Sequence, residues 1–416
     1  MVIKRFRVGR NIRTFHCTTK CPDDVGVEMQ EVVNHALDKA NELITFAYET
    51  NNKEYPGIIK PNLYVYVRED SIDDINAFTD GTDIYLSAAT TFGMVSYIHD
   101  RLDTKRLNGD KLVPDGLENT TSIKIYGRIL ELIVAHELIH IWHSHQQWKR
   151  HTMHYLLEAE SVESVFDDIL HEKVDISDVS SINIDAIIDN LIIDSGGVTC
   201  QNVYDIYYIQ QILELDADRG AIQLVMQKLH NDLHPYLMAC YNSNEATTNQ
   251  KAATMKMHGY ELGITIGAAA LMLGFFDKRR KISSFASLNF LLASDHPIPA
   301  IRFFEMDKVF HGMVGSMFKN DSIPKFLLNE TNAFVFDILA HSGEEMSIDN
   351  CFWMPVLTRE AQRFIALLNQ GWNRIHDSLQ SFSQIAIQEK YKKEELEVFT
   401  ECIRFDITGK YIRKEK

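Results

Sequence analysis

Apolar side chains recur every three or four residues along residues 26–50, and this spacing predicts an amphipathic helix near the start of the chain. Helical patterning also predicts helices at 203–230, 246–276, 300–314 and 361–393, within a stretch that we expect to be mostly helical from about residue 151 onward. Two short runs of β-branched and aromatic residues, 63–67 and 84–86, predict strands. We therefore expect an α+β fold that is mostly helical and contains a small β-sheet.

One predicted helix, which begins near Ser122, carries the sequence His-Glu-Leu-Ile-His, and residues 128–148 contain no Gly or Pro that would break it. Positions i and i+4 of a helix lie on one face, so His136 and His140 can bind one ion. Glu137 is rotated from His136 by about 100°, which can place its carboxylate beside a metal-bound water. Two imidazoles that bind zinc and a carboxylate that takes a proton from the attacking water are typical of zincin metallopeptidases.

A catalytic zinc site usually has a third protein ligand. A histidine six residues after the second, with a glycine between, would indicate a metzincin, but these positions hold Gln146 and His143. A later predicted helix offers carboxylates instead, because Glu214 and Asp218 are four residues apart and share one face. We expect Glu214 to complete the zinc shell and Asp218 to accept a hydrogen bond from a ligand histidine, while Asp216 points elsewhere on the helix.

Composition limits the partners and the compartment. A net charge of −16 over 416 residues argues against a nucleic-acid surface. The six cysteines are scattered and residues 1–17 lack the apolar core of a signal peptide, so we expect a cytoplasmic protein. Residues 262–276 are almost wholly apolar but short for a membrane span, which favours a core helix over a membrane contact.

The order of these motifs resembles a known family. His-Glu-x-x-His followed by Glu-x-x-Ala-Asp at residues 214–218 is similar to the gluzincin metallopeptidases that include HtpX, the CAAX prenyl endopeptidase and BepA. The resemblance covers about residues 60–305 and implies a zincin fold with one zinc ion per chain. The strongly hydrophobic spanning segments of the membrane-bound members have no counterpart here, so a membrane substrate is not implied.

The resemblance also implies roles for two weaker motifs. Asn76, Ala77 and Phe78 look like the family's edge strand over the substrate cleft. A Ser-Asp-His-Pro segment that contains His296, with Arg302 six residues further on, is similar to the family's Ser-Thr-His-Pro segment and its later Arg. By this resemblance His296 would help to stabilise the oxyanion, although a structural role is equally open, and Arg302 would lie near the substrate.

We therefore expect a zincin-like metallopeptidase domain over residues 1–330 and a helical portion over 331–416. The predicted function is zinc-dependent endopeptidase cleavage of a protein or peptide substrate, with Glu137 as general base. The alternative is a non-enzymatic zincin-like scaffold whose C-terminal helices bind a partner, or an enzyme kept latent by residues 158–178 or by the C-terminal portion. His143 could be a decoy ligand or a cleft residue, but we expect His143 and His145 to be structural or surface residues, and the sequence does not indicate an oligomeric state.

Overall fold

The structure is a computed structural model. It describes residues 2–8, 11–21, 27–68, 76–102, 118–155, 192–194, 197–200, 203–280, 296–317 and 359–392, with short pieces at 325, 327–329, 331, 404–405 and 411–412. The acidic segment 158–178 and the two residues before His296 lie outside the described residues.

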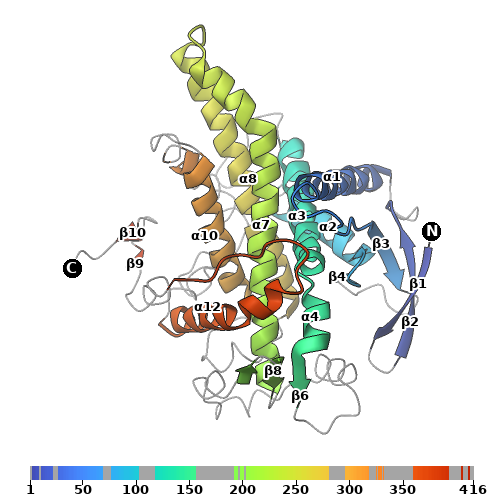
Figure 1. Ribbon diagram of the computed structural model, residues 1–416. Helices are drawn as coiled ribbons and strands as arrows, with labels where there is room; N and C mark the ends of the chain where they lie inside the picture. The colour runs from blue at the N-terminus through green and yellow to red at the C-terminus, as the bar shows by residue number, and fades with distance from the viewer. Residues whose placement is uncertain are drawn as a thin grey trace.

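The described part of the chain is mostly helical and contains a small mixed sheet, which confirms the coarse prediction (Figure 1). The helices are α1 (Val27–Asn51), α2 (Ala88–Leu102), α3 (Glu118–Trp142), α4 (His145–Thr152), α7 (Val203–Asn242), α8 (Thr248–Arg280), α10 (Pro299–Met317) and α12 (Arg359–Gln380). The strands are β1 (Val2–Val8), β2 (Asn11–Thr18), β3 (Leu63–Arg68), β4 (Ala77–Thr79), β5 (Ile84–Ser87), β6 (Met153–Tyr155), β7 (Ile192–Asp194), β8 (Gly197–Cys200), β9 (Arg404–Phe405) and β10 (Tyr411–Ile412).

Helix α3 lies at the centre of the main hydrophobic core. Its apolar residues are buried on all sides rather than on one stripe, as Ile125, Leu130 and Leu138 illustrate, and such a helix must be surrounded by others. Helices α1, α7 and α8 pack against it, and the long helix α7 runs through the middle of the molecule (Figure 1). The α3–α7 pair is therefore the rigid frame on which the predicted metal ligands stand.

Helix α8 contains the almost wholly apolar segment. Among the described residues, Thr248–Phe276 is long and apolar enough to cross a membrane, but most of its residues are buried inside the structure. The 262–276 segment contributes to the same core as α3, because Ile264, Ala268 and Leu273 are buried there. Its hydrophobicity is thus explained by packing.

The larger sheet has the strand order β1-β2-β3-β5-β4, so β4 forms one edge. Strands β3 and β5 pair in parallel, and the other neighbours are antiparallel. An aromatic cluster of Phe15, Tyr66, Phe78 and Tyr85 fills one face. Helix α3 packs against β4, which brings the edge strand close to the His-Glu-x-x-His helix.

The helix that carries the two histidines ends earlier than the sequence suggests. Helix α3 stops at Trp142, Ser144 adopts a left-handed conformation with φ 55°, and α4 begins at His145. The backbone N–H of Gln384 donates to the carbonyl of Trp142 at 2.7 Å, and the Ser383 hydroxyl donates to the same oxygen. These contacts from about 240 residues away satisfy a carbonyl that the ended helix leaves without a partner.

Several other boundaries differ from the prediction. Strands β6, β7 and β8 form a three-stranded sheet where a mostly helical chain was expected from residue 151. Each strand has only three or four residues, too few to show an alternating pattern, and β6 pairs with the distant β8. Helix α12 also ends at Gln380 rather than near residue 393, while α7 continues to Asn242.

The described part of the C-terminal portion packs directly on the central helices. Helix α12 contacts α7 and contributes Phe364, Leu368 and Trp372 to a second hydrophobic core. A Cβ on Gly371 would overlap the side chains of Ile212 and Tyr208, so the close approach of α12 to α7 depends on glycine at this position. The domain boundary near residue 330 remains a prediction.

Candidate metal centre

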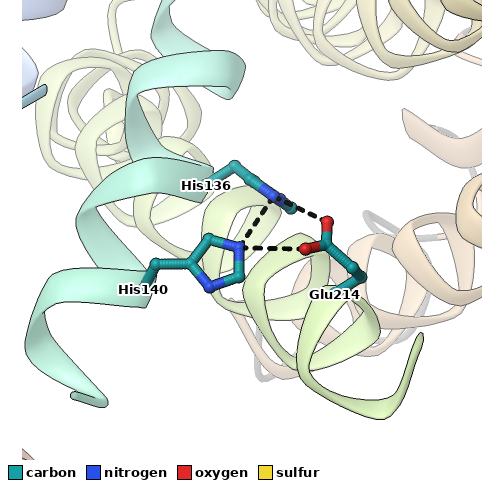
Figure 2. Close-up of side chains that lie close together, drawn as sticks. All are labelled: His136, His140 and Glu214. Atoms are coloured by element: carbon teal, nitrogen blue, oxygen red, sulfur yellow. Dashed lines mark hydrogen bonds and ion pairs between the residues drawn. The ribbon is translucent and has the colours of Figure 1, made fainter. Parts of the chain in front are cut away.

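Three predicted metal ligands come together where α3 and α7 pack. Figure 2 shows His136 and His140 of α3 pointing toward Glu214 of α7. The two Nε2 atoms lie 3.1 Å apart, Glu214 Oε2 lies 3.2 Å from His136 Nε2, and Glu214 Oε1 lies 3.5 Å from His140 Nε2. The i, i+4 spacing on a straight helix aims both rings to one side, and the neighbouring helix supplies the carboxylate.

The ring of His136 is fixed from behind by a buried ion pair. Its Nδ1 lies 3.0 Å from Asp218 Oδ1, and Arg302 donates two hydrogen bonds of 2.7 Å to the same carboxylate. A carboxylate paired with a guanidinium only accepts, so His136 donates from Nδ1, and Nε2 is the nitrogen that faces the cluster. The structure thus places Asp218 against His136, as expected, and places Arg302 against Asp218, where it is buried. The predicted contact of Arg302 with the substrate stays a prediction.

The electrostatics of the cluster favour a cation. Burial opposes protonation of His136, but Asp218 and Glu214 outweigh burial and raise its pKa to about 10. Burial also disfavours ionised Glu214, yet His296, His136 and His140 hold its pKa well below the ordinary value. For His140, burial dominates and lowers the pKa well below the ordinary value, so this imidazole is neutral. The site therefore attracts a positive ion toward two imidazoles and a carboxylate.

The donor atoms fit a metal ion. Glu214 Oε2 is buried and lies 3.2 Å from His136 Nε2 and 3.4 Å from His296 Nε2, whereas Oε1 accepts a hydrogen bond of 3.0 Å from Gln210. A buried carboxylate oxygen is costly unless a positive charge lies beside it, and here that charge can be a protonated imidazole or a bound cation that replaces the proton. Imidazole nitrogens with a carboxylate are a donor set that zinc binds in catalytic sites. These buried residues can thus hold a metal ion.

Glu137 lies beside this cluster in an unusual environment. Its side chain is only 7% exposed, and among the described residues no group forms a hydrogen bond or an ion pair with its carboxylate. Burial, opposed by the charge of His136, raises the pKa of Glu137 to about 7. A carboxyl group with this pKa can both accept and release a proton near neutral pH.

His296 lies at the open side of the cluster. Its Nε2 is 3.4 Å from Glu214 Oε2, and a quarter of its side chain is exposed. The structure therefore places this predicted residue within reach of the cluster, at the start of the segment that leads into α10.

The predicted edge strand presents backbone groups away from the sheet. The N–H of Ser87 donates to the carbonyl of Asn76, which fixes the β4–β5 register. Antiparallel pairing alternates, so Asn76 and Phe78 face β5 while Ala77 and Thr79 direct their backbone groups outward. The amide of Gln146, the residue at the metzincin ligand position, donates to the carbonyl of Thr79 at 2.5 Å. This leaves both backbone groups of Ala77 and the N–H of Thr79 directed away from the sheet.

A second group of buried side chains was not expected to act together. His143 Nδ1 and His145 Nε2 lie 2.5 and 3.0 Å from Asp216 Oδ2, and these three residues form another group that can hold a metal ion. On its other side, His145 Nδ1 lies 2.7 Å from Nδ1 of the predicted ligand His140. In the sequence, only the position of Asp216 between Glu214 and Asp218 pointed to this group. The position of His145 was not predictable, because it depends on the turn at Ser144.

Comparisons with family models, with curated proteins and with solved structures found no match.

Proposed function

We propose that the protein is a zinc-dependent endopeptidase with a zincin-like active site on α3 and α7. The observation that carries the proposal is the environment of Glu137, which is buried beside the three candidate ligands and has no hydrogen-bond partner among the described residues. A structural metal site needs no such carboxylate, and placing a carboxyl group in a mostly buried position costs free energy. A general base that must exchange a proton with water accounts for it.

The residues of the site have distinct roles in this proposal. His136, His140 and Glu214 hold one zinc ion, which when bound polarises the scissile carbonyl and lowers the pKa of water. Glu137 accepts the proton of the attacking water and then donates it to the leaving amine. His296 lies close enough to the cluster to donate a hydrogen bond to the developing oxyanion.

The edge strand supports a peptide rather than a small molecule as substrate. An extended peptide that adds to β4 can pair with Ala77 through both its N–H and its carbonyl and with Thr79 through its N–H. Because β4 packs against α3, a peptide bound in this way runs beside the helix that carries Glu137. Main-chain pairing tolerates many side chains, so we expect the enzyme to select its substrates through a few pockets along the strand.

The test compares the wild type with Glu137→Gln, which preserves the shape of the side chain and removes the base. Bound zinc is measured by atomic emission, and cleavage is measured by mass spectrometry of new peptide termini in a denatured proteome. We expect about one zinc per chain in both proteins and new termini only with the wild type.

Two outcomes would contradict the proposal. Absence of zinc from the wild type, even after refolding with zinc, would remove the metal site. Zinc retained in both proteins with no cleavage by either, also after deletion of residues 393–416, would favour the scaffold alternative. A thermal unfolding curve for each variant excludes loss of the fold as the cause.

A further inference from the structure

Four side chains form a continuous buried chain of contacts that ends on a candidate metal ligand. Asp216 Oδ2 lies 3.0 Å from His145 Nε2, and His145 Nδ1 lies 2.7 Å from His140 Nδ1. His143 Nδ1 meets the same Asp216 oxygen at 2.5 Å. Asp216, His143 and His145 are each less than 5% exposed, so water does not replace these contacts. We call the path from Asp216 through His145 to His140 the Asp216 relay.

The positions of the protons in the Asp216 relay follow from the donors and acceptors available. A carboxylate only accepts, so His145 must donate to Asp216 from Nε2. A neutral imidazole has one N–H, and His145 Nδ1 is then an acceptor. The hydrogen bond between the two Nδ1 atoms therefore takes its proton from His140. With its proton on Nδ1, His140 has its lone pair on Nε2, the atom that faces His136 and Glu214.

We propose that Asp216 and His145 are positioning residues that fix the tautomer and the ring orientation of His140 for metal binding. This inference rests on the proposed metal centre, and it gives His140 a support equivalent to the one that Asp218 gives His136. Partners of this kind orient ligand rings and increase their basicity, and their loss typically lowers metal affinity by about 10–100-fold. Asp218 contacts His136 directly, whereas Asp216 contacts His140 through the ring of His145.

The same assignment of protons means that a metal ion cannot occupy the group of His143, His145 and Asp216 while another ion occupies the candidate metal centre. An ion bound by His143 Nδ1, His145 Nε2 and Asp216 would move the proton of His145 to Nδ1. His145 would then donate to His140 Nδ1, and His140 Nε2 would have to carry a proton. A protonated Nε2 cannot bind a metal, so the two groups of ligands cannot both be filled while this 2.7 Å contact is kept.

The backbone explains how His145 reaches His140, five residues earlier. On a continuous helix, residues 140 and 145 would be rotated by about 140° relative to each other. The left-handed Ser144 ends α3 and starts α4 in a new direction, which turns the ring of His145 back onto that of His140. The end of α3 at Trp142 thus allows the ring of His145 to contact that of His140.

The test uses two nearly isosteric replacements of His145. Asn places a carbonyl oxygen near the position of Nδ1, so His145→Asn keeps an acceptor for His140, and His145→Leu removes it. The control is His143→Asn, which alters a side chain on the same carboxylate that does not touch His140. Zinc affinity is measured by competition with a chromophoric chelator, and far-ultraviolet circular dichroism and thermal unfolding verify the fold.

We expect zinc affinity to fall by about 10–100-fold in His145→Leu, to fall less in His145→Asn, which keeps the acceptor for His140 but loses the contact with Asp216, and to stay within a few-fold of the wild type in His143→Asn. Equal affinities for His145→Leu and His145→Asn, both folded, would overturn the Asp216 relay. Two zinc ions per chain in the wild type would also overturn it.

A second measurement does not depend on variants or on metal. Nitrogen-15 spectra of the histidine-labelled wild type distinguish the two tautomers of each neutral ring. We expect a protonated Nε2 and an unprotonated Nδ1 for His145 with and without zinc, and a proton on Nδ1 of His145 would refute the inference. A wild type that binds no zinc but shows the expected tautomer would contradict the proposed function and leave the hydrogen-bonded path intact, so the two failures are distinguishable.

Discussion

Gly220 on α7 provides a test of how closely the two helices of the site must pack. A Cβ at this position would lie 2.6 Å from both Cγ1 and Cδ1 of Ile139, and 3.2 Å from its Cγ2. Ile139 directly precedes His140, and Gly220 follows Asp218 by two residues. Carbon atoms prefer separations of about 3.5–4.0 Å, so Gly220→Ala requires a local shift of roughly 1 Å.

The expected magnitude follows from two opposing terms. Replacing Gly by Ala inside a helix stabilises by about 0.5–1 kcal/mol, because Gly loses more chain entropy on folding. Overpacking a tight contact costs about 1–3 kcal/mol. The matched control is Gly127→Ala in α3, where an added Cβ would have no atom within 4 Å. The helix term is common to both variants, so Gly220→Ala should be less stable than Gly127→Ala by about 1–3 kcal/mol.

The assay is urea denaturation of both variants and the wild type, without metal and with zinc. Gly127→Ala should raise the midpoint, and Gly220→Ala should show the lower midpoint of the two. Zinc affinity should fall in Gly220→Ala alone, because the shift separates His140 from Glu214. If both variants changed stability and zinc affinity equally, the close packing of α3 on α7 at Gly220 would not be the constraint inferred here.

Four further results are expected. Glu214→Ala should leave well below one zinc per chain after dialysis, and full retention would rule out Glu214 as third ligand. Arg302→Lys keeps the charge but loses the paired hydrogen bonds to Asp218, so zinc affinity should fall by about 10–100-fold in the same chelator competition; an unchanged affinity would show that Asp218 needs no such support. Gln146→Ala removes the hydrogen bond that holds Thr79 of the edge strand in place and should raise KM for peptides more than it lowers kcat, whereas a change confined to kcat would argue against strand addition. Removing zinc from protein held at a free zinc concentration 100 times Kd should lower the free energy of unfolding by about 2.7 kcal/mol, and identical urea midpoints with and without chelator would mean that the folded chain does not bind zinc.

The ligand residues were predictable because each signal is local to one helix. His136 and His140 form an i, i+4 pair, and Glu214 and Asp218 form another, so each pair needs only helical geometry to share a face. The structure adds that the ligand faces of α3 and α7 pack against each other. The apolar pattern of both helices suggested this packing but did not establish it. The zincin fold and the peptidase activity stay predictions, because spacing shows which donors can converge and not what reaction follows.

Features set by distant contacts could not be predicted. No Gly or Pro marks the end of α3 at Trp142, since its carbonyl is satisfied by Ser383 and Gln384 from the far end of the chain. The position of His145 depends on that ending, and therefore so does its contact with His140. The hairpin of β1 and β2 was also not predicted, because its pattern is interrupted by basic residues.

One short stretch of α7 supplies all three carboxylates that organise the candidate metal centre. Glu214 faces the metal position directly, Asp218 holds His136, and Asp216 reaches His140 through His145. Asp216 is rotated by about 200° from Glu214, so its carboxylate does not face the candidate metal centre directly. It can act on that centre only through a side chain from a second element that contacts both Asp216 and a ligand. Helix α4 does this, because the turn before it returns a histidine to the site. The alternating acidic positions of α7 and the break after α3 are therefore two parts of one arrangement, and a change in either should alter the ring of His140.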